Sequence, residues 1–383
     1  MPRLVALLAA SESRVVEDLW RALDVGDAVL PLDPRLSDAA RKRVTEAMRP
    51  GIFIDEQGEH HELSGAVPVD EGDALVMVTS GTTGEPKGVV LTRDAVVASA
   101  RATNARLAVD PSSDRWWACL PLAHIGGLSV VLRAREMGVG CDVEGFSGEA
   151  AKEATGRGDT LTSLVPTALG RLDDDTLGAF RRIVLGGQAP PSELPANVVT
   201  TYGMTETGSG VVYDGRPLDG VEVTLSERSE IFLRAPMLLR CYRDGRDPKT
   251  PDGWLATGDA GRFAPDGRLV VHGRIEDLVI TGGENVWPVA VEPVVERHPA
   301  VLEVAIAGRP DPEWGERVTA FVVVSGEVEA ATLLGEIRDL VRGELAGYAA
   351  PREIVLVDEL PRTPLGKVRR DGLSRLEGPS ASV

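Results

Sequence analysis

A glycine- and hydroxyl-rich segment constrains the fold of this chain more than any other feature of its sequence. The segment reads Thr79-Ser-Gly-Thr-Thr-Gly-Glu-Pro-Lys-Gly88. A short apolar run at 74–78 precedes it, and residues 89–105 beyond it have helical character. We therefore predict the order strand, glycine-rich loop, helix, which is typical of an α/β protein.

The composition of this segment suits a bound polyphosphate. Its glycines let backbone N–H groups approach an anion, its hydroxyls add donors, and Lys87 adds a positive charge. The segment is not a Walker A loop, because Pro86 occupies the second glycine position and Gly88 follows the lysine. For a segment of this composition taken alone, a plain flexible turn is the alternative.

The spacing of apolar residues changes along the chain. Apolar runs at 161–165 and 183–185 flank a helical stretch at 169–180, the βα alternation of a parallel sheet. Beyond residue 210 short period-two runs predict an antiparallel, barrel-like region, and a smaller α+β unit follows. We predict an α/β protein with a large N-terminal domain, 1–273, and a small C-terminal domain, 274–383.

Charge and cysteine content exclude several classes of function. With 41 Lys+Arg against 59 Asp+Glu, the net charge of −18 disfavours binding to nucleic acid or to an anionic membrane. Three cysteines without C-x-x-C spacing predict neither a disulfide framework nor a cysteine zinc site. The apolar run at 4–10 is short for a signal peptide and fits a first strand better, so we expect a cytoplasmic protein without membrane insertion.

Further motifs follow the glycine-rich segment and carry a family resemblance. With it, they resemble, in the same order, the motifs of the adenylate-forming superfamily, which includes acyl-CoA synthetases. The motifs are Leu185-Gly-Gly-Gln-Ala-Pro190, Thr201-Tyr-Gly-Met-Thr-Glu-Thr207, Gly253-Trp-Leu-Ala-Thr-Gly-Asp259, Gly273-Arg-Ile-Glu-Asp-Leu-Val-Ile-Thr-Gly-Gly-Glu-Asn285 and Pro361-Arg-Thr-Pro-Leu-Gly-Lys367.

The resemblance implies an acid:CoA ligase that uses ATP, Mg²⁺ and CoA in two steps, acyl-adenylate formation and then thioester formation. It implies that Glu206 binds Mg²⁺, that Thr205 contacts the α-phosphate, and that Asp259 and Arg274 reach the ribose. Taken singly, Glu206 could be a solvated surface residue and Asp259 a turn residue. The remaining nucleotide-binding residues implied are Thr79, Ser80, Gly81, Thr82, Thr83, Gly84, Lys87, Gly186, Gly187, Gln188, Tyr202, Gly203 and Met204.

The resemblance also implies a mobile lid. Residues 274–383 would carry the catalytic lysine, Lys367, and rotate between the two half-reactions about an acidic hinge residue. The hinge position is Glu276 here, where the family more often has Asp. Outside its motif, Lys367 could be an ordinary solvated charge.

The acid that is activated is less sharply defined. The segment around His124 supplies no Asp for an amino-acid ammonium group, which disfavours peptide-synthetase function. Together with Ser163, Thr167 and Gly208, it resembles the o-succinylbenzoate:CoA ligases of menaquinone synthesis, in particular their compact actinobacterial form. The 78 residues before the glycine-rich segment fit that form. This substrate has a second carboxylate, whose partner the sequence does not identify, and His124 is either a catalytic or substrate-contacting residue or a packed gate residue.

Several alternatives stay open. One is a CoA ligase for another aryl or short-chain acid, and one of a different class is a catalytically silent nucleotide-binding protein, which intact Lys87, Glu206, Asp259 and Lys367 disfavour. A P-loop kinase or GTPase is disfavoured by the order Pro86-Lys87-Gly88. The sequence does not distinguish a monomer from a homodimer.

Overall fold

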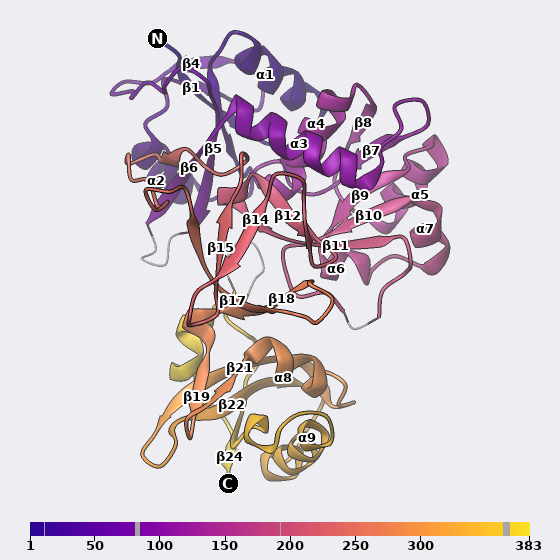
Figure 1. Ribbon diagram of the computed structural model, residues 1–383, viewed down its shortest axis with the longest axis vertical. Helices are drawn as coiled ribbons and strands as arrows, with labels where there is room; N and C mark the ends of the chain where they lie inside the picture. Colours follow the sequence, from indigo (N-terminus) through magenta and orange to yellow (C-terminus); the bar gives the residue numbers. More distant parts are fainter. Residues whose placement is uncertain (11, 81–84, 192, 363–367) are drawn as a thin grey trace. The chain divides into compact units, whose positions relative to one another are not determined.

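The computed structural model describes residues 1–10, 12–80, 85–191, 193–362 and 368–383 (Figure 1). Its contacts divide the chain into two compact units. The first comprises Met1–Thr224, Phe232–Ala256 and Pro265–Leu269, and the second comprises Leu225–Ile231, Thr257–Ala264 and Val270–Val383. The continuous part of the second unit begins at Val270. The domain boundary that the sequence predicts, after residue 273, stays a prediction.

The first sheet has seven strands in the order β16-β6-β5-β2-β1-β3-β4. Strand β1 pairs in parallel with β2 and β3, and β2 pairs in parallel with β5. Strands β1 and β2 are buried throughout, as expected of parallel strands covered on both faces. The predicted first strand is thereby confirmed. The elements are β1 (Leu4–Leu8), α1 (Ser13–Asp24), β2 (Ala28–Leu32), α2 (Asp38–Met48), β3 (Ile52–Ile54), β4 (His60–Glu62), β5 (Asp73–Ser80), β6 (Pro86–Thr92) and β16 (Cys241–Tyr242).

The predicted order strand, loop, helix is wrong at the glycine-rich segment. Strand β5 pairs antiparallel with β6, from Asp73 opposite Thr92 to Ser80 opposite Pro86. Helix α3 begins only at Arg93 and ends at Leu107, and the Thr92 hydroxyl caps it by accepting the Ala95 N–H. The order is strand, loop, strand, helix, because the apolar residues after the loop pair with β5 instead of starting the helix.

The second sheet, in the same unit, has the order β13-β12-β11-β10-β9-β7-β8. Strands β8, β7, β9, β10 and β11 form parallel pairs. The helix expected at 169–180 is two helices, because Gly170 ends the first and the Asp173 side chain caps the second. The elements are β7 (Arg115–Ala118), α4 (Ile125–Met137), β8 (Gly140–Val143), α5 (Gly148–Arg157), β9 (Leu161–Leu164), α6 (Pro166–Leu169), α7 (Asp174–Ala179), β10 (Arg182–Leu185), β11 (Val198–Met204), η1 (Thr205–Thr207), β12 (Ser209–Tyr213) and β13 (Arg216–Pro217).

Two further sheets follow in the chain. A four-stranded sheet has the order β14-β15-β17-β18, and a six-stranded sheet of the second unit has the order β20-β19-β22-β23-β24 with β21 paired to β22. These sheets confirm the predicted α/β class. Their elements are β14 (Glu222–Leu225), β15 (Glu230–Arg234), β17 (Leu255–Phe263), β18 (Leu269–Arg274), η2 (Ile275–Asp277), β19 (Val279–Thr281), β20 (Glu284–Val286), α8 (Pro288–Val295), β21 (Val301–Asp311), β22 (Gly315–Val324), α9 (Ala330–Glu344), η3 (Gly347–Ala349), β23 (Glu353–Leu356), η4 (Arg370–Arg375) and β24 (Ser380–Ser382).

Within the described part of the chain, no helix combines the length and apolar character needed to cross a membrane. The longest helices, α3 and α9, have 15 residues each, and both carry charged side chains.

A buried carboxylate lies beside the edge strand β8. Asp159 is 1% exposed, and neither of its side-chain oxygens accepts a hydrogen bond. Arg115 and Arg157 approach these oxygens to 3.5 and 3.8 Å, and both arginines also pair with Asp142. Burial, followed by the charge of Asp142, raises the pKa of Asp159 to about 7.

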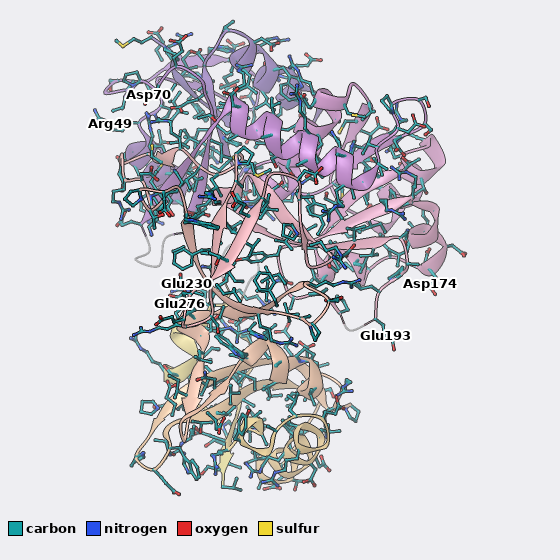
Figure 2. The ribbon with its side chains drawn as sticks, in the orientation of Figure 1. Arg49, Asp70, Asp174, Glu193, Glu230 and Glu276 are labelled. Atoms are coloured by element: carbon teal, nitrogen blue, oxygen red, sulfur yellow. The ribbon has the colours of Figure 1, made fainter. Side chains whose placement is uncertain are left out.

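This raised pKa predicts a pH-dependent loss of stability. Because the folded state holds a proton that the unfolded chain releases near pH 3.8, the wild-type protein loses stability as the pH rises toward about 7. Asn does not titrate, so the variant Asp159→Asn should not share this loss. The free energy of unfolding of the variant minus that of wild type should therefore be about 1–3 kcal/mol larger at about pH 8 than at about pH 4.5. Urea unfolding at both pH values measures this difference. The prediction would be contradicted if the stability difference between variant and wild type did not change with pH. It would also be contradicted if Asp174→Asn, the same change at an exposed position (Figure 2), gave an equal pH-dependent difference.

Helix α4 starts in close contact with the segment before it. A Cβ atom on Gly127 would lie 2.4 Å from the Leu120 carbonyl oxygen and 2.5 Å from that of Pro121. On the neighbouring Gly126, a Cβ atom would approach nothing closer than 3.8 Å. The first turn of α4 is therefore held at a distance that only glycine allows at residue 127.

We predict opposite effects of alanine at these two neighbouring positions. Gly127→Ala forces backbone apart and should lower the free energy of unfolding by about 1–3 kcal/mol. Gly126→Ala meets no obstacle in a helix and should raise it by about 0.5–1 kcal/mol. Urea unfolding of both variants measures the contrast, and equal changes in the two would show that the close approach does not limit residue 127.

Candidate active site

The ends of the glycine-rich segment are fixed by strand pairing. Thr79 lies opposite Lys87, and Ser80 lies opposite Pro86, at the tip of the β5–β6 hairpin. Lys87 thus projects from the first residues of β6, next to the loop that the hairpin closes. The predicted phosphate contacts Gly81, Thr82, Thr83 and Gly84 lie outside the described residues.

Glu206 lies in the tight turn η1 between β11 and β12. The Thr207 hydroxyl accepts the Met204 N–H at 2.9 Å and donates to the Ser209 carbonyl at 2.6 Å, which closes the turn on itself. The Gly208 N–H donates to the Thr205 carbonyl. Thr205 and Glu206 are therefore presented side by side, as the motif predicts, and both are partly exposed.

Tyr242 on strand β16 connects two of the predicted site residues. Its hydroxyl donates to Glu206 Oε1 at 3.1 Å, and its ring centroid lies 5.9 Å from Lys87 Nζ. Among the residues that the structure describes, no three His, Cys, Asp or Glu side chains gather at one metal site. A single carboxylate whose second oxygen is not bonded by Tyr242 suits Mg²⁺, which proteins often bind through one carboxylate and substrate phosphates.

A second group of the predicted nucleotide-binding residues lies beyond the carboxyl end of β10 and along β11, which pair in parallel. Carboxyl ends of parallel strands are the usual place for a nucleotide in such sheets. A Cβ atom on Gly203 would lie 2.1 Å from the Ser209 carbonyl oxygen, so only glycine fits there. Tyr202 is partly buried, and Gly187 and Gln188 are exposed. The structure brings six predicted residues into adjacent positions: Gly186, Gly187 and Gln188 after β10, and Tyr202, Gly203 and Met204 at the end of β11.

Asp259 and Arg274 contact each other within the second unit. Arg274 Nε lies 3.0 Å from Asp259 Oδ1, and Arg274 Nη1 donates to the Thr257 carbonyl at 2.9 Å. Asp259 on β17 is 7% exposed, whereas the Arg274 side chain at the end of β18 is exposed. One oxygen of the predicted ribose acceptor is thus engaged by the arginine predicted to act beside it.

The predicted hinge residue Glu276 is exposed in η2 (Figure 2). Its neighbour Asp277 instead faces inward, where Arg370 Nε lies 3.3 Å from its carboxylate. Burial raises the pKa of Asp277. The hinge role of Glu276 stays a prediction, and the predicted catalytic Lys367 lies outside the described residues.

His124 precedes the first turn of α4 and faces a carboxylate from the other sheet. Its Nε2 lies 3.5 Å from Asp33 Oδ2. Asp33 is itself fixed by Arg35, whose Nε and Nη2 donate to its two oxygens at 2.9 and 2.7 Å. Although burial alone would raise it, the pKa of Asp33 lies below its usual value because of Arg35 and His124. The Asp33 carboxylate is therefore a fixed negative partner for the imidazole.

The remaining acyl-site candidates differ in exposure. Ser163 is buried on β9, and Gly208 is buried in the turn before β12. Thr167 is exposed on α6. The acyl-site roles of these three residues stay predictions.

Arg133 on α4 is a candidate site residue that the sequence did not point to. It is 3% exposed, and within the described residues its guanidinium donates to two hydroxyls, Ser209 Oγ at 3.0 Å and Ser163 Oγ at 3.4 Å. Its Nε has no hydrogen-bond partner, and no carboxylate of the described residues forms an ion pair with it. A buried charge normally requires an ionic partner. The available signal was an arginine within a helix whose residues 127–134 are all buried.

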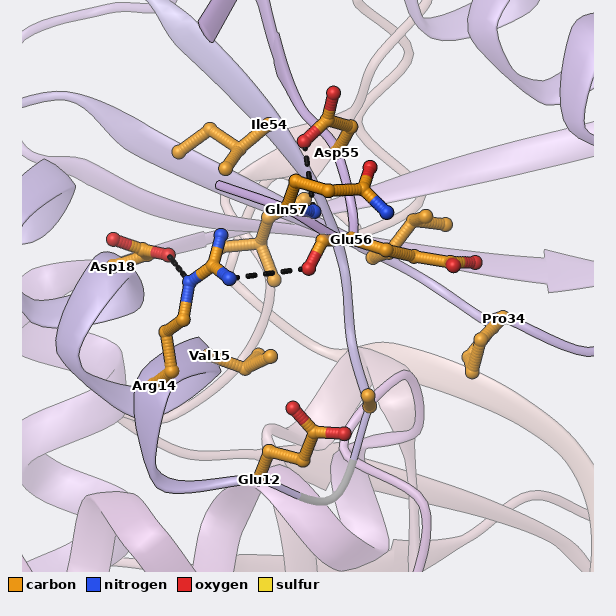
Figure 3. Close-up of a pocket in the computed structure, with 12 residues that line it drawn as sticks. Glu12, Arg14, Val15, Asp18, Pro34, Ile54, Asp55, Glu56 and Gln57 are labelled. Carbon is orange, nitrogen blue, oxygen red and sulfur yellow. Dashed lines mark hydrogen bonds and ion pairs between the residues drawn. The ribbon is translucent and has the colours of Figure 1, made fainter. Parts of the chain in front are cut away.

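A hollow of about 310 Å³ elsewhere in the first unit contains none of the predicted site residues (Figure 3). It lies at the carboxyl ends of β1 and β3, beside the start of α1. Arg14 donates to the Glu56 carbonyl at 3.2 Å and lies 3.9 Å from Asp18. Since Glu12, Asp18, Asp55 and Glu56 line it against one arginine, it does not suit an anionic ligand.

Comparison with protein families gives two matches in this chain. Residues 3–228 match the AMP-binding enzyme family, and residues 290–367 match the AMP-binding enzyme C-terminal domain. A probable 2-succinylbenzoate–CoA ligase of Mycobacterium tuberculosis is 38% identical over 344 residues, which cover 83% of this chain and 89% of that protein. The 2-succinylbenzoate–CoA ligase of Bacillus subtilis is 31% identical over 404 residues, 96% of this chain and 82% of that protein.

Solved structures show the same likeness. The o-succinylbenzoate CoA synthetase of Bacillus subtilis in complex with its acyl-adenylate intermediate has a TM-score of 0.86 and 28% identity. The comparison covers 98% of this chain and 89% of that one. The same enzyme in complex with ATP and a magnesium ion has a TM-score of 0.83, with 97% of this chain and 89% of that one covered.

Proposed function

The chain belongs to the AMP-binding enzyme family, and from this premise we propose that it is an AMP-forming acid:CoA ligase that converts 2-succinylbenzoate (o-succinylbenzoate) to its CoA thioester. This is the ligase step of menaquinone synthesis that the sequence resemblance implies. The relatives named above support this choice of acid.

The reaction needs activation because a carboxylate carbonyl is a poor electrophile and oxide is a poor leaving group. In the first step a carboxylate oxygen of the acid attacks the α-phosphorus of ATP, and pyrophosphate leaves. In the second step the thiol of CoA attacks the acyl carbonyl, AMP leaves, and the thiol proton is released. The first step concentrates negative charge at phosphorus, so fixed cations are required.

We assign each predicted site residue one role in this reaction. Lys87 and the hairpin loop bind the polyphosphate, Thr205 contacts the α-phosphate, and Glu206 would hold Mg²⁺. The bound ion would neutralise phosphate charge. Asp259 accepts the ribose hydroxyls, and Lys367 on the lid, turning about Glu276, serves adenylation. We also propose a cytoplasmic location, where ATP and CoA are available, and we leave monomer or homodimer open.

The observation that carries the choice of acid is the buried Arg133. The acid has an aliphatic carboxylate that reacts and an aromatic carboxylate that must be recognised. The Arg133 guanidinium donates to the Ser163 and Ser209 hydroxyls and lies 5.8 Å from the centroid of the Trp116 ring, and its planar donors suit a carboxylate. A monocarboxylic acid would leave this charge buried and unpaired, which is costly.

Replacing Arg133 should therefore change the preference between two acids. Arg133→Gln should lower kcat/KM for 2-succinylbenzoate by about 10- to 100-fold in a pyrophosphate-release assay, because an ionic hydrogen bond is lost. For 4-oxo-4-phenylbutanoate, which lacks the aromatic carboxylate, kcat/KM should change by less than about threefold.

Two controls accompany this measurement. Arg135→Gln makes the same change on the same helix at an exposed arginine and should leave both acids unaffected. Arg133→Lys keeps the charge and should retain more activity with 2-succinylbenzoate than Arg133→Gln. Equal losses for the two acids in Arg133→Gln would contradict the recognition role.

A further inference from the structure

A short segment, Leu239–Arg243, is bonded to both elements that carry the predicted phosphate-handling residues. At one end, the Leu239 N–H donates to the Glu206 carbonyl at 2.8 Å. In the middle, Cys241 and Tyr242 pair antiparallel with β6. At the other end, the Arg243 N–H donates to the Gly88 carbonyl at 2.7 Å, one residue beyond Lys87. One segment thus fixes the positions of η1 and the start of β6 against each other.

The same segment is strongly anchored. Arg240 donates from Nε and Nη2 to the two oxygens of Asp73, both at 2.9 Å, and Asp73 is 2% exposed. Lys249 Nζ donates to the carbonyls of Leu239 and Arg240 at 2.7 and 2.9 Å. These bonds are charge-assisted and so stronger than neutral ones. The backbone that carries Tyr242 is therefore held in one place.

The Tyr242 side chain contacts one carboxylate and two cationic side chains. Its hydroxyl donates to Glu206 Oε1, and its ring carries Lys87 Nζ at 5.9 Å and Arg246 Cζ at 5.7 Å from the centroid. Burial, followed by the charge of Glu206, raises the pKa of Tyr242 to about 12. The phenol therefore stays protonated and remains a hydrogen-bond donor at neutral pH.

Lys87 and Glu206 both contact Tyr242 but form no ion pair with each other in the described part of the chain. A direct pair would neutralise the lysine before a phosphate arrives and would occupy the carboxylate before a divalent ion does. Instead, the phenol donates a hydrogen bond to one oxygen of Glu206, and its ring makes a cation–π contact with Lys87 that leaves the lysine charge unneutralised.

We propose that Tyr242 is a positioning residue for the divalent ion and the polyphosphate. Its hydroxyl orients Glu206 so that the second oxygen faces the ion, and its ring holds Lys87 ready for phosphate. This inference deepens the proposed function, since it assumes that ATP and a divalent ion bind at these two residues.

Two variants separate the hydroxyl from the ring. Tyr242→Phe keeps the ring and loses the donor, so Mn²⁺ binding at a fixed ATP concentration, followed by the EPR signal of free Mn²⁺, should weaken by about 5- to 20-fold. Metal-free ATP binding, followed by calorimetry, should change less than about twofold. Tyr242→Leu loses both, and its metal-free ATP binding should also weaken by about threefold to tenfold.

The coupling to Glu206 is tested in a second background. If Tyr242 acts through Glu206, then Tyr242→Phe should have no further effect on Mn²⁺ binding in Glu206→Gln. Tyr348→Phe, the same change at an exposed tyrosine, is the matched control.

Unchanged or tighter Mn²⁺ binding in Tyr242→Phe, or equal weakening in the presence and absence of the Glu206 carboxylate, would overturn the inference. Far-UV circular dichroism and the unfolding midpoint verify that each variant is folded. The binding assays contain neither acid nor CoA, so a wrong choice of acid leaves the expected result unchanged, whereas a wrong role for Tyr242 changes it.

Discussion

Every proposed substrate of this chain is an anion, whereas the chain itself carries a net charge of −18. Such a protein repels ATP, CoA and a dicarboxylate at long range, so binding depends on a few cations held in fixed places. Two of them are kept from neutralisation in different ways. Arg133 is buried among hydroxyls, and Lys87 rests on the ring of Tyr242 without pairing to Glu206.

Local patterns predicted the parts of the fold whose cause is local. Strands such as β1 are buried on both faces and read as continuous apolar runs, so the parallel sheets could be expected from sequence. Strand β6 could not, because Val89, Val90 and Leu91 suit a helix or a strand, and only pairing with β5 decides between them. The division of 169–180 into two helices followed from capping by Asp173, a signal that was present but not used.

The candidate site likewise contains residues that a local motif predicts and residues that only long-range contacts bring together. Thr205 and Glu206 lie in one turn, so a short motif predicted them together. Arg133 reaches Ser209, 76 positions away, and Tyr242 reaches Glu206, 36 positions away, so no local pattern records either contact. The acidic partner of His124 is likewise Asp33, from the end of β2 in the other sheet. Motifs therefore predicted which nucleotide chemistry to expect, whereas Arg133, which we propose selects the acid, could be recognised only from the fold.

The measurement that tests the central claim most directly is acid-dependent release of pyrophosphate from Mg·ATP across a panel of carboxylic acids. The panel contains 2-succinylbenzoate, 4-oxo-4-phenylbutanoate, benzoate and short-chain acids, with CoA thioester formation followed in parallel. We predict that 2-succinylbenzoate gives the highest kcat/KM and is converted to its CoA thioester with release of AMP. Turnover of benzoate or a short-chain acid without turnover of 2-succinylbenzoate would contradict the account, as would ATP binding without pyrophosphate release for any acid.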